Sequence, residues 1–207
     1  MFSNLDDFAP VGVESGVGLA LRDESNRYLF FLAGTRHHCP PGELFYAGIG
    51  GHQEPGEDWI DCAEREAREE IGSGVSIIPS PDTWYLPRGG AAERVHVSDQ
   101  PRPLALYEMI HPEGTPRAGD LYRLVIYRAR LTNRPRDLPS EEISGVLALT
   151  ISQVVKGLDR CATLGQLLEE DAAMVLEPDE IDRQTHLYPL GTAVALARVL
   201  KIGNIKT

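Results

Sequence analysis

Gly51-His-Gln-Glu-Pro-Gly-Glu57 and, further along, Arg65-Glu-Ala-Arg-Glu-Glu-Ile-Gly72 are the stretches that decide how this chain folds. They place a glycine-containing turn directly before a helix that is dense in carboxylates. At roughly 100° per helical residue, Glu66, Glu69 and Glu70 project from one face within an arc of about 100°. Such carboxylates repel one another without a cation, and oxygen ligands of this kind suit Mg²⁺. The pattern therefore predicts a metal site that binds phosphate.

A solvated helix surface is the simpler alternative for these charges. Glu64 with Arg68, and Arg65 with Glu69, are i,i+4 pairs that contribute ~0.2–0.5 kcal/mol each on an exposed helix. That alternative does not explain why three carboxylates cluster just after a Gly-Gly and a Pro-Gly turn. The planar fork of Arg65 is also suited to orienting a carboxylate that binds a metal.

At these residues the chain resembles the Nudix hydrolase family. The family signature is a glycine, five residues, a glutamate, seven residues, then Arg-Glu-apolar-any-Glu-Glu-any-Gly-apolar. Every fixed position is met, and the apolar places hold Ala67 and, as the one departure, Ser73. The resemblance implies an α/β/α sandwich with a mixed β-sheet. The fixed positions are Gly51, Glu57, Arg65, Glu66, Glu69, Glu70 and Gly72.

The resemblance also implies the chemistry. Magnesium, for which manganese substitutes, is expected on Glu66, Glu69, Glu70 and the Gly51 carbonyl, where it bridges a diphosphate and lowers the pKa of the attacking water. A further carboxylate from a late loop often acts in the family as a base or ligand. Here Glu141 or Glu142 is the candidate for that role.

Length and charge limit the other possibilities. The 207 residues fit one domain, and the net charge of −11 argues against nonspecific binding to nucleic acid or anionic membrane. The N-terminus carries Asp6 and Asp7 instead of a basic segment, and no long apolar run follows, so we expect neither a signal peptide nor a membrane span. A cytoplasmic location is the expectation. Three widely separated cysteines, Cys39, Cys62 and Cys161, are expected to be free thiols.

Hydrophobic patterns predict the elements around the motif. Two apolar runs separated by a polar turn at 23–26 indicate a hairpin, and the motif helix is expected to span Trp59–Ile71 and end at Gly72. An apolar-faced helix at about 187–202 is expected either to pack on the core or to form a homodimer contact. Strands are expected at 16–21, 28–33, 43–47, 75–78, 104–110, 121–129 and 146–150, with a short helix at 152–155 and a turn at 111–117.

The remaining segments bear on the substrate. Residues 79–103 are expected to form a long loop inserted beside the active face, where Trp84 and Tyr85 either anchor the loop to the core or stack on a nucleobase, and Arg88 and Arg94 are candidates for reaching a phosphate. Arg36 is the stronger phosphate candidate because a strand end would aim it into a cleft. His37-His38-Cys39 is interpreted as a loop flanking that cleft and not as a zinc site, since adjacent side chains in an extended segment point to opposite faces.

Substrate choice stays open at this point. Pro87, shortly after the signature, and the acidic pair at 141–142 are similar to features of family members that cleave ADP-ribose and related nucleotide sugars. The alternatives are hydrolysis of nucleoside triphosphates, dinucleotide polyphosphates or coenzyme A. A different class of function is a regulatory domain that binds nucleotides without turnover. Such domains often lose signature carboxylates, and this chain keeps all of them.

Overall fold

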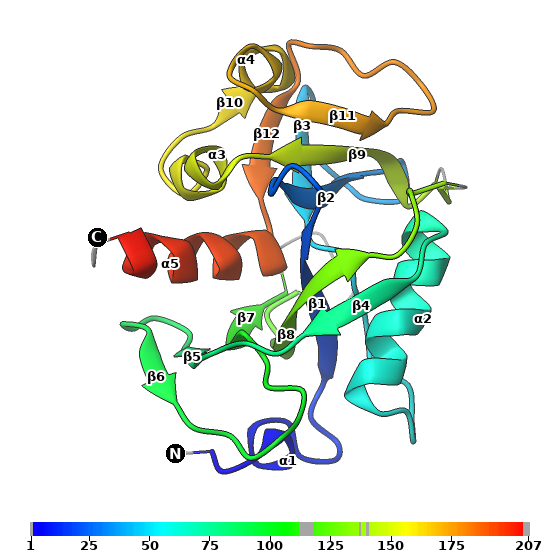
Figure 1. Ribbon diagram of the computed structural model, residues 1–207. Coiled ribbons are helices and arrows are strands. Elements are labelled where there is room, and N and C mark those ends of the chain that lie inside the picture. Colours follow the sequence, from blue (N-terminus) through cyan, green and yellow to red (C-terminus); the bar gives the residue numbers. More distant parts are fainter. Residues whose placement is uncertain (1, 112–117, 137, 140, 205–207) are drawn as a thin grey trace.

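The central strand of the molecule, β1, lies between a parallel and an antiparallel neighbour. A computed structural model describes residues 2–111, 118–136, 138, 139 and 141–204 (Figure 1). In the described part of the chain, twelve strands join in one mixed sheet. The strands are β1 (Ser15–Arg22), β2 (Tyr28–Ala33), β3 (Glu43–Ala47), β4 (Val75–Ile78), β5 (Thr83–Leu86), β6 (Glu93–Val95), β7 (Ala105–Ile110), β8 (Leu121–Leu131), β9 (Ile143–Leu149), β10 (Ala162–Thr163), β11 (Ala173–Leu176) and β12 (His186–Pro189). The helices are α1 (Leu5–Phe8), α2 (Trp59–Ile71), α3 (Ile151–Lys156), α4 (Leu164–Glu169) and α5 (Thr192–Asn204).

Strand pairing around β1 agrees with the hairpin predicted from the sequence. β1 and β2 run antiparallel, with Arg22 opposite Tyr28, and the turn between them is closed by Asn26 at a φ of 62°. On its other side β1 is parallel to β8 over its whole length, from the pair Ser15 and Arg123 onward. This mixture of directions brings the start of β1 and the end of β7 to the same end of the sheet, on either side of β8, where the candidate site lies.

Helices cover both faces of the sheet, so the predicted α/β/α sandwich is confirmed. Val17, Leu19 and Leu21 of β1 point into the core that α2 closes, whereas Ala20 points into the core that α5 closes. Figure 1 shows α2 and α5 on opposite sides of β1. Alternation of side chains along one strand therefore supplies both layers of the core.

Helix α2 has the bounds that the sequence predicts. Asp58 caps its start by accepting hydrogen bonds from the backbone N–H groups of Ile60 and Asp61, both at 2.8 Å. Gly72 ends it in the left-handed conformation, with a φ of 56°. Ala63 and Ala67 are fully buried, and their small side chains let the helix backbone approach the sheet closely. The opposite side of α2 is thereby fixed toward solvent and the site.

Two sequence expectations were wrong in part. The segment 79–103 is not a simple loop, because it contains β5 and β6, and β5 pairs in parallel with β7. Thr83 and Leu86 are buried, which anchors this segment in the sheet. The C-terminal helix begins at Thr192, later than expected, because His186–Pro189 forms β12 beside β3. The residue before a proline disfavours the helical conformation, and Tyr188 precedes Pro189.

Two further expectations concern single features. Cys39, Cys62 and Cys161 are free thiols. Among the described residues, no helix has the length and apolar character needed to cross a bilayer.

Candidate metal and phosphate site

Arg65 joins the signature loop to the signature helix. Its guanidinium forms a two-pronged contact with Glu57, from Nε to Oε1 at 2.8 Å and from Nη2 to Oε2 at 2.9 Å. It also donates to the backbone carbonyl of His52 at 2.9 Å. Bidentate pairs of this kind fix direction as well as distance. Glu57 is therefore an anchor for Arg65, and the contact holds the pKa of the Glu57 carboxyl at about 2.

The same guanidinium orients two of the predicted metal ligands. Arg65 Nη1 lies 2.8 Å from Glu66 Oε1 and 3.0 Å from Glu69 Oε2, so the Arg65 and Glu69 pair is present as predicted. The other predicted i,i+4 pair, Glu64 with Arg68, closes at 2.9 Å. Of these two pairs, Glu64 with Arg68 is an ordinary surface ion pair, whereas Arg65 contacts the carboxylate cluster.

Glu70 is held by the loop that precedes the helix. The backbone N–H of Gly50 donates to Glu70 Oε2 at 2.8 Å. Burial raises the pKa of Glu70 well above its ordinary value, and the nearby carboxylates of Glu66, Glu142 and Glu69 raise it further, against the Gly50 hydrogen bond, which lowers it. Burial likewise raises the pKa of Glu66, although Arg65 opposes this. A cation placed among these groups would relieve the repulsion.

The carboxylate cluster fits a hard divalent cation. Glu66, Glu69 and Glu70 offer only oxygen donors, and Glu69, with 61% of its side chain exposed, leaves one side open to water and substrate. The predicted fourth donor, the Gly51 carbonyl, accepts a hydrogen bond from the Val17 N–H at 2.9 Å. A carbonyl oxygen has a second lone pair, so its role as a metal ligand stays a prediction.

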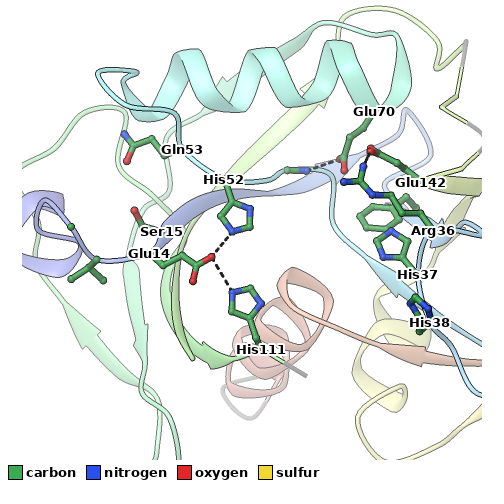
Figure 2. Close-up of a pocket in the computed structure, with 14 residues that line it drawn as sticks. Glu14, Ser15, Arg36, His37, His38, His52, Gln53, Glu70, His111 and Glu142 are labelled. Atoms are coloured by element: carbon green, nitrogen blue, oxygen red, sulfur yellow. Dashed lines mark hydrogen bonds and ion pairs between the residues drawn. The ribbon is translucent and has the colours of Figure 1, made fainter. Parts of the chain in front are cut away.

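A cleft of about 1320 Å³ opens beside Glu70, which lines it, whereas Glu66 and Glu69 do not. Glu70 and Glu142 lie on one wall, while a second group of polar side chains lies across the cleft (Figure 2). The lining residues are Gly12, Val13, Glu14, Ser15, Phe31, Arg36, His37, His38, Gly50, His52, Gln53, Glu70, His111 and Glu142.

Two substrate-facing predictions are placed in this cleft. Arg36 follows β2, lines the cleft and forms an ion pair through Nη1 with Glu142 Oε1. Its own backbone N–H donates to the Glu141 carbonyl at 2.7 Å, which fixes the strand end beside the acidic pair. Glu142 lines the cleft near Glu70, whereas the exposed Glu141 does not. The geometry distinguishes two neighbours that the sequence leaves equivalent.

His37 and His38 also line the cleft, as the sequence interpretation of this loop expects. The His37 ring stacks on Phe31 with centroids 6.4 Å apart and meets the edge of Phe45 at 5.0 Å. Burial lowers the pKa of His37 despite the opposing charge of Glu142. An uncharged ring on the cleft wall can contact another flat ring.

The predicted residues of the 79–103 segment lie elsewhere. Tyr85 donates from its hydroxyl to Glu108 at 3.0 Å and packs edge-on against Phe2 and Phe8. The Trp84 ring lies under the Arg94 guanidinium at 5.4 Å. Neither aromatic residue lines the described cleft, and exposed Arg88 does not either. Trp84 and Tyr85 are anchored in β5 and pack against the core, as the alternative for these aromatic residues expects, and the roles of Trp84, Tyr85 and Arg88 toward substrate stay predictions.

Among the cleft residues that sequence reasoning missed, four have the clearest roles. Gly50 precedes the signature, yet its N–H holds Glu70. Glu14, His52 and His111 come from three separate segments and meet in space. His52 sits inside the signature at a variable position, and His111 was expected only in a turn whose residues 112–117 lie outside the described part. No local pattern signals such a group, because tertiary pairing of β7 with β8 brings it together.

The comparisons with known proteins identify the family. A sequence model described as the NUDIX domain matches residues 13–166. Because this match spans most of the 207 residues, the chain belongs to the Nudix family, and it is a Nudix pyrophosphohydrolase. A comparison with curated proteins gives no match.

Solved structures show distant likenesses. A NUDIX hydrolase from Nitrosomonas europaea is 16% identical with a TM-score of 0.44, covering 69% of this chain and 75% of that one. A MutT protein from Methanosarcina mazei is 13% identical with a TM-score of 0.45, covering 69% and 80%. A NUDIX-family hydrolase from Clostridium perfringens is 12% identical with a TM-score of 0.46, covering 93% and 99%. The family assignment rests on the sequence match.

Proposed function

We propose that this enzyme hydrolyses the diphosphate linkage of a nucleotide sugar, with ADP-ribose foremost, to give AMP and a sugar phosphate. The observation that carries the proposal is the cleft of about 1320 Å³ that Glu70 of the signature lines. Pockets for small ligands commonly measure about 300–1,000 Å³. A cleft larger than this range favours a substrate with bulky groups on both sides of its diphosphate.

The carboxylates would hold the cation, and the cation would bind the diphosphate. Glu66, Glu69 and Glu70 are the proposed ligands of Mg²⁺, with the Gly51 carbonyl as a further donor, and Mn²⁺ is expected to substitute. When bound, the cation supplies neutralisation of charge on the diphosphate oxygens and a lower pKa for the attacking water. Arg65 keeps two of the three carboxylates oriented through contacts of 2.8 and 3.0 Å.

Arg36 and Glu142, on the same side of the cleft as Glu70 (Figure 2), would bind the substrate phosphate and activate the attacking water. Arg36, with 67% of its side chain exposed, can leave Glu142 and donate to a substrate phosphate. Glu142, released from that pair, would accept a proton from the attacking water. Water adds to one phosphorus, the bond from that phosphorus to the bridging oxygen breaks, and the bridging oxygen leaves on the second phosphate. His37, stacked on Phe31, offers a flat contact for the base.

A substrate panel tests the proposal. Purified enzyme with Mg²⁺ is assayed for kcat/KM on ADP-ribose, a UDP- or GDP-sugar, a dinucleotide polyphosphate and a nucleoside triphosphate. We expect ADP-ribose to be preferred and AMP to be released. A clear preference for the triphosphate would overturn the substrate assignment and leave the metal-dependent hydrolase intact.

A regulatory domain without turnover is the second candidate function. The intact set of Glu57, Arg65, Glu66, Glu69 and Glu70 and their mutual contacts support catalysis instead. Tight binding of the same compounds with no released monophosphate would establish the regulatory alternative. We further propose a homodimer and a cytoplasmic location, and light scattering after size exclusion tests the former.

A further inference from the structure

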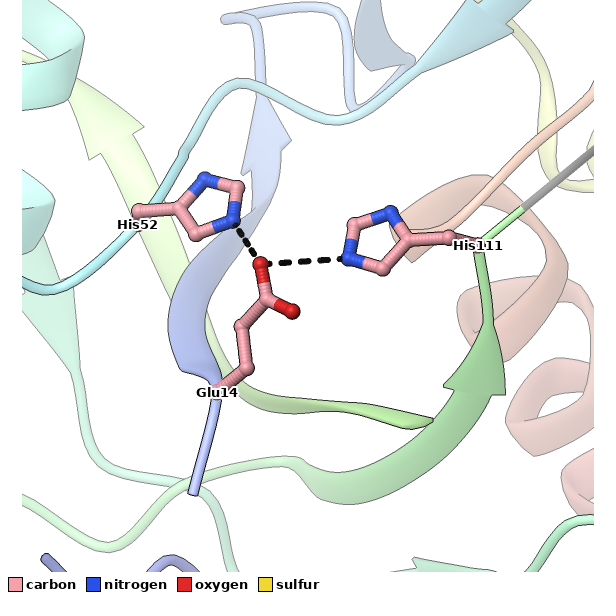
Figure 3. Close-up of side chains that lie close together, drawn as sticks. All are labelled: Glu14, His52 and His111. Carbon is pink, nitrogen blue, oxygen red and sulfur yellow. Dashed lines mark hydrogen bonds and ion pairs between the residues drawn. The ribbon is translucent and has the colours of Figure 1, made fainter. Parts of the chain in front are cut away.

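A cluster of two histidines and one glutamate lies across the cleft from Glu70 and Glu142 (Figure 2). Glu14 directly precedes β1, His52 follows the signature glycine and His111 directly follows β7. One ligand atom from each residue lies within 4.8 Å of the other two. Figure 3 shows both imidazole rings turned toward the same carboxylate.

We propose that Glu14, His52 and His111 form a second metal site, selective for Zn²⁺ over Mg²⁺. Two imidazole nitrogens and one carboxylate oxygen are a mixed donor set that suits zinc, whereas Mg²⁺ requires oxygen ligands. The site is chemically distinct from the all-oxygen cluster of Glu66, Glu69 and Glu70. It requires no hydrolytic activity and is therefore independent of the proposed function.

The distances support convergence on one ion. His52 Nε2 lies 2.7 Å and His111 Nε2 lies 3.3 Å from the same oxygen, Glu14 Oε1. Around a tetrahedral zinc with bonds of about 2.0–2.2 Å, neighbouring ligand atoms lie roughly 3.4 Å apart. Small rotations of the three side chains would therefore bring all three donors onto one ion.

His111 gives an independent reason to expect a ligand. Its side chain is only 14% exposed, and Nε2 is buried without a hydrogen-bond partner among the described residues, since the 3.3 Å contact with Glu14 lacks hydrogen-bond geometry. A buried polar atom left in this way costs free energy. Coordination of a cation through Nε2 would remove that cost.

The three ligands are held in place by the surrounding strands. The His111 N–H donates to the Asp120 carbonyl at 3.0 Å, and the Glu14 carbonyl accepts from the Arg123 N–H at 3.1 Å. His52 forms an isolated bridge with Gly16. Buried Tyr122 lies against both imidazoles, at centroid distances of 4.8 and 4.9 Å, and the two rings are parallel within 4°. Such support preorganises a metal site.

Three protein ligands leave a position for a further ligand. Zinc in catalytic sites typically keeps water or substrate in a fourth place beside three protein donors. Here Glu14, His52 and His111 all line the cleft, so the open position would face its interior. An oxygen-containing group at the far end of a cleft ligand could take it.

Equilibrium dialysis against Zn²⁺, in excess Mg²⁺ to occupy the oxygen-donor cluster, tests the proposal. The full chain is compared as wild type, His52→Ala, His111→Asn and Glu14→Gln. His96→Ala is the matched control, because this exposed histidine lies outside the cleft lining. We expect about 100-fold or greater loss of zinc affinity in each cluster variant and wild-type affinity in the control.

Cobalt absorption gives a second readout. Co²⁺ bound to the wild type should show the intense visible absorption of four-coordinate cobalt, and His52→Ala should lose it. If circular dichroism shows that His111→Asn does not fold, His52→Ala still tests the proposal. The wild-type His52 side chain is 58% exposed, so its removal is expected to leave the fold intact. Wild-type zinc affinity in folded His52→Ala, or absence of zinc binding by the wild type, would overturn the proposal.

Discussion

The backbone N–H of Gly50 and Oε2 of Glu70 lie 2.8 Å apart, which joins the residue before the signature to the last carboxylate of α2. This hydrogen bond offsets part of the burial that raises the pKa of Glu70. It also leaves the other oxygen of the carboxylate available to a cation. The position of Glu70 is thus set by the backbone and not only by helical spacing.

Neutral replacement of the cluster should abolish turnover without unfolding the protein. Glu69→Gln or Glu70→Gln removes an anionic ligand at nearly constant size, and we expect kcat/KM to fall at least about a hundredfold. Glu64→Gln is the matched control, because Glu64 lies on the same helix and pairs only with Arg68 among the contacts described above. The comparison requires kcat/KM and a circular dichroism spectrum for each of the three variants.

Removal of the metal should have the same effect as these substitutions. Chelator-treated enzyme should be inactive, Mg²⁺ or Mn²⁺ should restore it, and Ca²⁺ should support turnover poorly because it favours longer bonds and more ligands. Initial rates across a metal titration measure this. Near-wild-type turnover in chelator-treated enzyme is the result that contradicts the mechanism.

Glu141 and Glu142 form a matched pair for the general base. Glu142 lines the cleft and contacts Arg36, whereas Glu141 contributes its backbone carbonyl to the Arg36 N–H. Glu142→Gln should lower kcat about 10²–10⁴-fold with little change in KM, and Glu141→Gln should be nearly silent. If both variants keep full kcat across the pH range, neither residue is the base.

The Glu57 and Arg65 contact should stabilise the fold above acidic pH. Arg65 lowers the pKa of Glu57 from 4.5 to about 2. The contribution is therefore fully present above pH 4.5 and is lost as the pH falls through 2. Glu57→Gln should reduce the free energy of unfolding by about 1–2 kcal/mol at pH 7, after allowance for solvent screening.

The pH dependence supplies the control for this variant. At pH 3 the difference in free energy of unfolding between wild type and Glu57→Gln should be less than half of that at pH 7, as measured by urea denaturation. A difference that does not change with pH would show that the loss arises from packing and not from the ion pair.

Gly16 permits the close approach of the signature loop to β1. A Cβ there would clash with the Tyr122 hydroxyl and the Gly51 carbonyl, so Gly16→Ala should destabilise the fold by about 1–3 kcal/mol. Gly203→Ala is the comparison, because a Cβ there meets nothing within 4 Å inside α5, and it should be neutral or stabilising by up to about 1 kcal/mol. Thermal denaturation of both variants checks this, and equal effects would contradict it.

Local signals explain which parts of the fold were predictable. The bounds of α2 follow from Asp58, the periodic alanines and Gly72, all of which act within the helix. β12 was missed because its partner β3 is distant in the chain, and four residues ending in a proline carry little pattern of their own. β5 and β6 were hidden for a similar reason, since β5 depends on β7 for its pairing.

The candidate site divides in the same way. Fixed spacing along one helix places the carboxylates together, so the cluster of Glu66, Glu69 and Glu70 could be inferred directly. Glu14 and His111 meet only because β1 and β7 both pair with β8, a long-range arrangement that no spacing in the chain reveals. Trp84 and Tyr85 pack against the core, which is one of the two alternatives that the sequence left open, and no local pattern could decide between them.

Arg65 forms hydrogen bonds with Glu57, Glu66, Glu69 and the His52 carbonyl at the same time. The loop and the helix of the signature are therefore joined into one unit by a single guanidinium. The strand ends and loops on the other walls of the cleft contribute no anchor to this guanidinium among the contacts described. The segment from Arg36 to His38 can therefore be exchanged without breaking the contacts of Arg65. Grafting the segment that carries Arg36 to His38 from another Nudix enzyme is accordingly a practical route to altered selectivity in this protein.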